Sequence, residues 1–289
     1  MDSADLQSMM MQRIPSLPNK AKRVTEYLLS NMREAAFKSI GEVADELKVS
    51  KAQLVRVARV LGFGGYSELK DCLQKAILEQ INPAAMLTKA VGMKNELPEK
   101  IRQTEQVNID DTWMQIDTAK VDEFCRMASE ARCTAFLGWG ISSLVMELAY
   151  SRFCVMGLPT TLIKRGSLSL VEQARALPVG SVLVVCEVPS YAIDVTEAVS
   201  DVKKNCAAKV ITISDSAAAP ICRFSDLSFF VSASSPTFGS SIIGPVFLVH
   251  ILTSSLVVHL GDSAREALEK QAAYLHDERF YHPIFGLKY

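Results

Sequence analysis

Between residues 20 and 81 the hydrophobic positions recur at helical spacing, and no alternating strand pattern interrupts them. The spacing predicts helices over residues 20–31, 40–47, 50–61 and 66–81. In the third of these, the apolar side chains Leu54, Val57, Ala58 and Leu61 share one stripe. The pattern therefore predicts a small all-α N-terminal domain, which we assign to residues 1–80.

From residue 118 onward the pattern changes, because short apolar runs now alternate with helical segments. The runs predict strands over residues 134–137, 160–163, 181–187, 209–214 and 227–231. Helices are expected from the GWGIS motif to residue 156, over residues 193–205, and over about residues 240–259. This alternation is typical of an α/β domain with a parallel sheet sandwiched between helices, here assigned to residues 118–289.

Residues 81–117 differ from both flanking parts, because they combine prolines, a glycine and many charges. We interpret them as a linker with helical segments, such as residues 98–107 with Pro98 in the first turn.

The amino-acid composition and the cysteines indicate what class of protein this chain is. Of the 289 residues, 49 % are hydrophobic and 22 % are charged, which fits a soluble globular chain and excludes a disordered one. The seven cysteines include no C-x-x-C pair, so we expect reduced thiols and a cytoplasmic protein. The net charge is −1, but residues 1–82 hold twelve basic and ten acidic residues, a balance of +2.

The apolar run over residues 242–260 is the one membrane-like segment. It contains Gly244, Pro245, His250 and His259, so a buried core helix is expected rather than a membrane span. No acidic residue accompanies the two histidines in this run, so we expect core or interface histidines. We expect neither a metal ion nor a cofactor.

Residues 39–59, SIGEVADELKVSKAQLVRVAR, have the pattern of a helix-turn-helix. Lys48 and Val49 form the turn, and Ser50 is placed to cap the next helix. Lys51, Gln53, Arg56 and Arg59 lie on or near the face opposite the apolar stripe, where such side chains contact phosphates and base edges. The alternative is an ordinary two-helix corner with a solvated basic face.

Residues 17–78 resemble the N-terminal domain of the RpiR family of bacterial regulators. The resemblance rests on SIGEVADELKVSKAQLVRVARVLGFGGYSELK, in which Phe63 and Tyr66 are expected in the core. It implies a DNA-binding domain with Ser50, Lys51, Gln53, Arg56 and Arg59 at the DNA. The family usually has a small hydroxyl residue at the position of Gln53, a departure that bears on the operator sequence and not on the fold.

The junction GWGISS is a candidate ligand site at the end of a predicted strand. Gly138 and Gly140 let the backbone approach a ligand, and Ser142 and Ser143 stand at a helix start that favours an anion such as phosphate. The alternative is a tight turn with Ser142 as a plain helix cap.

Residues 121–260 are similar to SIS domains, the sugar isomerase module that follows the DNA-binding domain in RpiR regulators. The similarity rests on GWGISS, SVLVVCEV and VITISDSAAAPICRFSDLSFFV, and it implies a sugar or sugar-phosphate ligand. The ligand-binding residues it implies are Gly138, Gly140, Ser142, Ser143, Glu187 and Ser190.

One loop departs from the SIS pattern S-x-S-G-x-T-x-E. Glu187 and Pro189 replace the two serines, and Ala192 replaces the threonine. Either the ligand is unphosphorylated or carries an amino group, or its phosphate moves toward Ser142, Ser143, Ser190 and Lys164. A further alternative is that Glu187 forms an ion pair with a nearby basic side chain.

The sequence therefore predicts a transcription regulator and not an enzyme. Its expected partners are double-stranded operator DNA with palindromic half-sites, a small-molecule effector, and further copies of the chain in a homodimer or homotetramer. The alternative is a sugar-phosphate isomerase with an appended helical domain, for which Glu187, Glu147 and Glu197 are the candidate bases.

Overall fold

The computed structural model describes residues 3–81 and 83–277, which form two compact units. The helical unit comprises residues up to 98 together with 236–239, and the sheet unit comprises residues 99–235 and those from 240 onward. Residues 278–289, the last part of the predicted C-terminal domain, lie outside the described residues.

The helical unit is a bundle around one hydrophobic core. Its helices are α1 (Ser3–Arg13), α2 (Asn19–Ser30), α3 (Met32–Phe37), α4 (Ile40–Leu47), α5 (Lys51–Val60), α6 (Tyr66–Ile81) and α7 (Pro83–Gly92). A short 3-10 helix, η1 (Ile14–Ser16), joins α1 to α2. The four predicted helices are confirmed as α2, α4, α5 and α6, whereas α1 and α3 were not expected. Leu6 and Met10 of α1 are fully buried in the same core as Leu28, Leu54 and Leu69, so α1 is part of the bundle.

The sheet unit is built on five parallel strands in the order β2-β1-β3-β4-β5. The strands are β1 (Thr134–Gly138), β2 (Thr160–Ile163), β3 (Val182–Glu187), β4 (Lys209–Ser214) and β5 (Leu227–Phe230). All five predicted strands are present, and the predicted parallel sheet is confirmed. Because every strand runs the same way, their carboxyl ends lie along one edge of the sheet.

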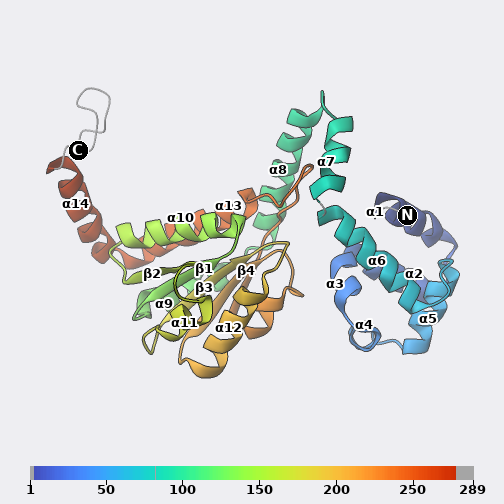
Figure 1. Cartoon of the computed structure of the whole chain (residues 1–289), viewed down its shortest axis with the longest axis horizontal. Coiled ribbons are helices and arrows are strands. Elements are labelled where there is room, and N and C mark those ends of the chain that lie inside the picture. Colours follow the sequence, from blue (N-terminus) through green and yellow to red (C-terminus); the bar gives the residue numbers. More distant parts are fainter. Residues whose placement is uncertain (1–2, 82, 278–289) are drawn as a thin grey trace. The chain divides into compact units, whose positions relative to one another are not determined.

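Helices cover both faces of this sheet. The helices of the sheet unit are α8 (Leu97–Met114), α9 (Thr118–Glu130), α10 (Ile141–Val155), α11 (Leu170–Arg175), α12 (Ile193–Asn205), α13 (Ile243–Leu260) and α14 (Asp262–Asp277), with a 3-10 helix η2 (Pro220–Phe224). One core joins a face of the strands to α9, α10 and α13, and a second joins the opposite face to α11, α12 and η2. Figure 1 shows α10 and α13 on one side of the sheet and α12 on the other.

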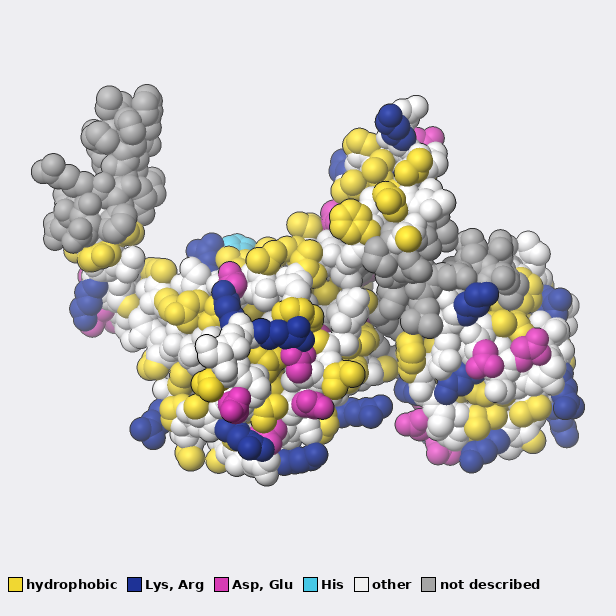
Figure 2. Space-filling view, in the orientation of Figure 1, with side chains coloured by type: hydrophobic (Ala, Val, Ile, Leu, Met, Phe, Trp, Pro, Cys, Tyr) yellow, Lys and Arg dark blue, Asp and Glu magenta, His cyan; other side chains and the backbone are white. Residues whose placement is uncertain are grey.

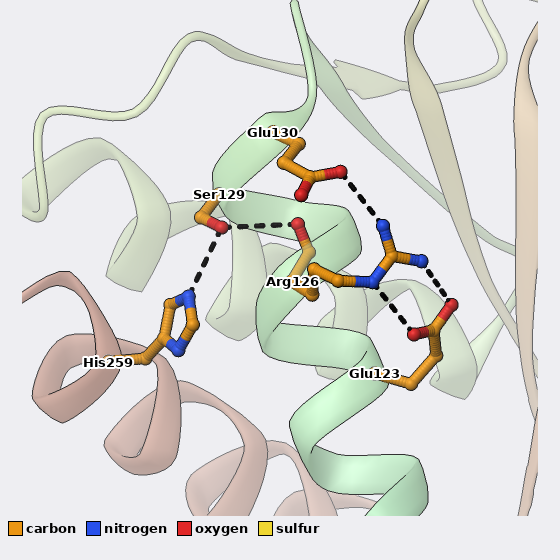
Figure 3. Close-up of polar contacts among 5 residues, drawn as sticks. All are labelled: Glu123, Arg126, Ser129, Glu130 and His259. Carbon is orange, nitrogen blue, oxygen red and sulfur yellow. Dashed lines mark hydrogen bonds and ion pairs between the residues drawn. The ribbon is translucent and has the colours of Figure 1, made fainter.

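Helix α13 is the membrane-like run of the sequence. It is the one helix of the described chain that is long and apolar enough to cross a membrane, with a mean hydropathy of 1.8 over 18 residues. Its inner face nevertheless packs in the core against α9 and α10. In Figure 3 the exposed ring of His259 points toward Ser129 of α9, with Nε2 and Oγ 3.3 Å apart, beside the ion pairs of Arg126 with Glu123 and Glu130. His250 is exposed as well, so of the two expected roles the core role is wrong and the interface role stays a prediction.

Helix α8 is held to the sheet unit by a buried polar network. The side chain of Asn108 is fully buried and donates to Glu105 and to the carbonyl of Ser234. Its Oδ1 accepts from the Ser232 hydroxyl and the Ser234 N–H at 2.9 and 3.0 Å. The predicted linker over residues 81–117 is therefore largely helical, and its second helix is docked by hydrogen bonds.

Candidate functional site

The turn between α4 and α5 has the backbone that a helix-turn-helix needs. Lys48 ends α4 in the left-handed conformation with φ 52°, which turns the chain sharply toward the next helix. Ser50 then caps α5, because its Oγ accepts the N–H of Gln53 at 3.2 Å. In return the side chain of Gln53 accepts the N–H of Ser50, which completes a capping box.

Helix α5 presents opposite faces to the core and to solvent. Leu54, Val57 and Ala58 are buried in the helical core. Lys51 and Arg56 are exposed and form no hydrogen bond or ion pair with the described residues. Figure 2 shows Lys and Arg side chains over the helical unit around α2 and α5, interspersed with Asp and Glu. The exposed stripe of α5 thus carries unpaired positive charge, as a DNA-contacting helix requires.

Two predicted contacts of α5 are partly engaged within the protein. The Arg59 Nε donates to the carbonyl of Gly64 at 3.3 Å, although the side chain remains exposed. Gln53 is half-buried and uses its amide oxygen in the capping box, so only its amide nitrogen is left to donate. Phe63 and Tyr66 are buried in the core, which confirms the expectation for these two rings.

The predicted ligand residues Gly138, Gly140, Ser142 and Ser143 lie at the junction between strand β1 and helix α10. A Cβ at Gly138 would lie 2.6 Å from the carbonyl oxygen of Ser142, so the strand and helix approach at a distance that only glycine permits. Gly140, with φ 57°, is the N-cap of α10, and no side chain caps this helix. The alternative that Ser142 is a plain helix cap is therefore wrong.

The two serines of this junction make contacts within the protein. Ser142 is 2 % exposed, and its Oγ accepts the N–H of Val188 at 3.4 Å. Ser143 donates its hydroxyl to the carbonyl of Gly140 at 2.8 Å. Ser142 thereby links the β1–α10 junction to the loop that follows β3, whereas Ser143 is half-buried beside it.

Glu187 ends strand β3 and is 2 % exposed. Its Oε1 accepts the N–H of Ala192 at 2.6 Å, while Oε2 has no hydrogen-bond partner. No ion pair of the described chain involves Glu187, so the alternative prediction, in which Glu187 pairs with a basic side chain, is wrong. Burial, with a smaller contribution from the negative charges of Asp194 and Asp215, raises the pKa of Glu187 to about 7, against the lowering effect of the Ala192 N–H.

Two cations lie after strand β2, and both are paired with carboxylates. Lys164 forms an ion pair with Glu147 of α10. Arg165 pairs with Asp194 of α12 at 2.6 Å, and its guanidinium lies 3.3 Å from the ring centroid of Trp139. The Arg165 hydrogen bond holds the pKa of Asp194 below its usual value.

The trio Trp139, Arg165 and Asp194 was not predicted. It joins the ends of β1 and β2 to the first turn of α12. The sequence signal was weak, because these residues are far apart in the chain and meet only through the strand order.

The loop between β3 and α12 contacts Glu187 through the N–H of Ala192. Ser190 is exposed and has a positive φ of 89°, unusual for a residue with a side chain. The next residue, Tyr191, donates its hydroxyl to Asp215 after strand β4 at 2.7 Å. The predicted residues Ser142, Glu187 and Ser190 therefore belong to one set of adjoining loops at the carboxyl ends of β1, β3 and β4.

Two cavities of the sheet unit lie away from these loops. One of about 150 Å³ is at the amino ends of the strands, where it is lined by residues such as Met127 and Lys209. The other, of about 220 Å³, is formed by α10, α13 and α14 and includes Arg152 and His250. Neither cavity contains a predicted ligand residue.

Sequence comparisons agree with this arrangement. Residues 5–80 match the model of the helix-turn-helix domain of the rpiR family. An uncharacterized HTH-type transcriptional regulator of Clostridium perfringens is 24 % identical over 89 % of this chain and 94 % of its own length. The HTH-type transcriptional regulator RpiR of Escherichia coli is 27 % identical over 71 % of this chain and 68 % of its own.

Solved structures have the same fold. The NanR protein of Vibrio vulnificus, solved in complex with ManNAc-6P, matches 94 % of this chain and 98 % of its own with a TM-score of 0.60 and 19 % identity. The sugar isomerase domain of an RpiR transcription factor from Sphaerobacter thermophilus matches 62 % of this chain and 99 % of its own with a TM-score of 0.59 and 18 % identity.

The helical unit contains a helix-turn-helix domain of the rpiR family, and the parallel-sheet unit has the fold of a sugar isomerase (SIS) domain. Over most of its length the chain is similar to these HTH-type transcriptional regulators.

Proposed function

We propose that this chain is a transcription regulator that binds operator DNA through α5 and that a small sugar-type effector, bound in the SIS domain, changes this binding. The observation that carries the proposal is the exposed, unpaired pair Lys51 and Arg56 on a helix whose opposite face is buried. Such a helix fits the major groove with cations at phosphates and base edges.

A symmetric assembly completes the proposal. One recognition helix reads a short half-site, so a homodimer or homotetramer is needed to read a palindromic operator. Effector binding shifts DNA affinity only if the effector binds two arrangements of the protein with different affinities. A sugar phosphate or related sugar is the proposed effector class, supported by the complex of NanR with ManNAc-6P.

DNA binding is tested by fluorescence anisotropy with DNA from upstream of the gene that encodes this protein. We expect Arg56→Ala to weaken binding by about tenfold and to reduce the slope of log K against log salt by about one, because one phosphate contact is lost. Lys75→Ala is the matched control, since Lys75 is an exposed cation of α6 in the same unit. Equal losses in both variants would contradict a role for α5.

Effector binding is tested by thermal unfolding of the whole chain with a panel of sugars and sugar phosphates. A compound that binds the folded state raises the melting temperature, and the same compound is expected to change DNA affinity. Isomerase turnover of a sugar phosphate, together with no sequence-specific DNA binding, would instead establish the enzyme alternative.

A further inference from the structure

The carboxyl group of Glu187 has one oxygen engaged and one unsatisfied. Oε1 accepts the N–H of Ala192, and Oε2 has no partner although the residue is 98 % buried. A buried carboxylate oxygen without a donor is costly in free energy, so a donor supplied from outside the protein would be bound favourably.

Glu187 also accepts the hydrogen bond of a backbone N–H that an anionic ligand would need as a donor. Ala192 is the N-cap of α12, and an N–H at the start of a helix is a common phosphate ligand. Here that N–H already donates to the Glu187 carboxylate at 2.6 Å. Pro189, in the same loop, has no N–H to offer. The loop therefore presents a carboxylate at the place where a phosphate site presents donors.

The surrounding charges add to this preference. Asp194 and Asp215 lie close enough to Glu187 to act on it electrostatically, and both disfavour its ionisation. The cations Lys164 and Arg165 are already paired, with Glu147 and with Asp194. A ligand cation would gain from the carboxylates as well as from the hydrogen bond, whereas a hydroxyl would gain only the hydrogen bond.

We propose that Glu187 is a specificity-determining residue that binds an ammonium group through Oε2, so that the effector is an amino-bearing sugar whose amino group lies at the β3–α12 loop. Phosphate is excluded from this loop and, where the ligand has one, lies elsewhere along the strand ends. The loop over residues 189–192 is partly exposed and must shift to admit the ligand. The inference rests on the proposed function in one respect, which is that the effector binds at these loops.

The test is a two-by-two comparison of ligands by calorimetry on the whole chain. D-glucosamine, D-glucose and their 6-phosphates separate the amino group from the phosphate group. We expect each amino compound to bind at least about tenfold more tightly than its parent sugar, the size of one charge-assisted hydrogen bond.

Three variants make the test specific. Glu187→Gln keeps the shape of the side chain and removes its charge, so the preference for amino compounds should fall to about onefold. Glu187→Ser frees the Ala192 N–H and restores a hydroxyl, so binding of glucose 6-phosphate should improve by about tenfold. Glu123→Gln is the control, because Glu123 is an exposed carboxylate of α9 away from these loops, and it should leave all four affinities unchanged.

The outcomes separate this inference from the proposed function. Binding of both 6-phosphates without an amino preference, unchanged in Glu187→Gln, would overturn the role of Glu187 and leave a sugar-phosphate effector in place. Absence of binding by both amino compounds would also overturn it. A cooperative thermal unfolding transition at the pH of the binding assay confirms that each variant is folded.

Discussion

Removing the charge of Glu187 should change how stability depends on pH. The folded-state pKa of this carboxyl is about 7, against 4.5 for the ordinary group. Because the folded pKa is the higher one, the stability that the protonated group contributes is fully present below pH 4.5 and is lost as pH rises through about 7. From these two values the loss between pH 5 and pH 8 is about 2–3 kcal/mol.

The Glu187→Gln variant isolates this effect. Its amide oxygen can still accept the Ala192 N–H. Its amide N–H₂ takes the place of Oε2, which has no hydrogen-bond partner in the wild type, so it resembles the O–H of a neutral carboxyl at that position. The variant should therefore be close to wild type in stability at pH 5. At pH 8 it should be more stable by about 2–3 kcal/mol, because the wild-type carboxylate must then be ionised while buried.

Urea unfolding at pH 5, 6, 7 and 8 gives the measurement. Both tryptophans of the chain, Trp113 and Trp139, lie in the sheet unit, so their fluorescence follows the unit that contains Glu187. Subtracting the variant from wild type at each pH cancels the other titrating groups. A difference in unfolding free energy that stays constant across this range would refute the assignment of the raised pKa to Glu187.

Three further predictions concern the anchors of the fold. Asn108→Ala should lower the free energy of unfolding of the sheet unit by about 2–4 kcal/mol, because the buried side chain makes four hydrogen bonds. Urea unfolding measures this loss, and a value below about 1 kcal/mol would contradict the prediction. Gly244→Ala should lower the melting temperature in tryptophan fluorescence, since its Cβ would lie 2.2 Å from the carbonyl oxygen of Ser232; an unchanged value would show that the two segments move apart freely. Ser50→Ala should cost the helical unit about 1 kcal/mol through loss of the α5 cap, measured by circular dichroism; equal stability would mean that the capping box contributes nothing.

Elements that form one continuous pattern between turn residues were predictable from the local sequence alone. Helix α12 and strands β2 and β4 have the predicted bounds, because each is an uninterrupted run of the right period between turn residues. Helix α1 was missed because Met9, Met10 and Met11 are consecutive and blur the period, although only Met10 is fully buried. Helix α11 was missed because six residues are too few to show a period.

The candidate site was only partly predictable. The sequence indicated that Glu187 replaces a phosphate-binding serine, because that substitution is visible in one loop. It did not indicate that the carboxylate would turn back to accept the Ala192 N–H, since this depends on the path of residues 188–191. Nor could it place Arg165 over Trp139, which requires β1 and β2 to be neighbours in the sheet. The contacts of Lys51 and Arg56 with DNA stay predictions.

The polar docking of α8 has a mechanical consequence. Hydrogen bonds weaken steeply when their angle changes, so the bonds of Asn108 allow the helix a single inclination against residues 232–234. The chain passes from the helical unit into the sheet unit next to Pro98, within the first turn of this helix. A displacement of residues 232–234 therefore either breaks these hydrogen bonds or carries all 18 residues of the helix with it as one rigid body.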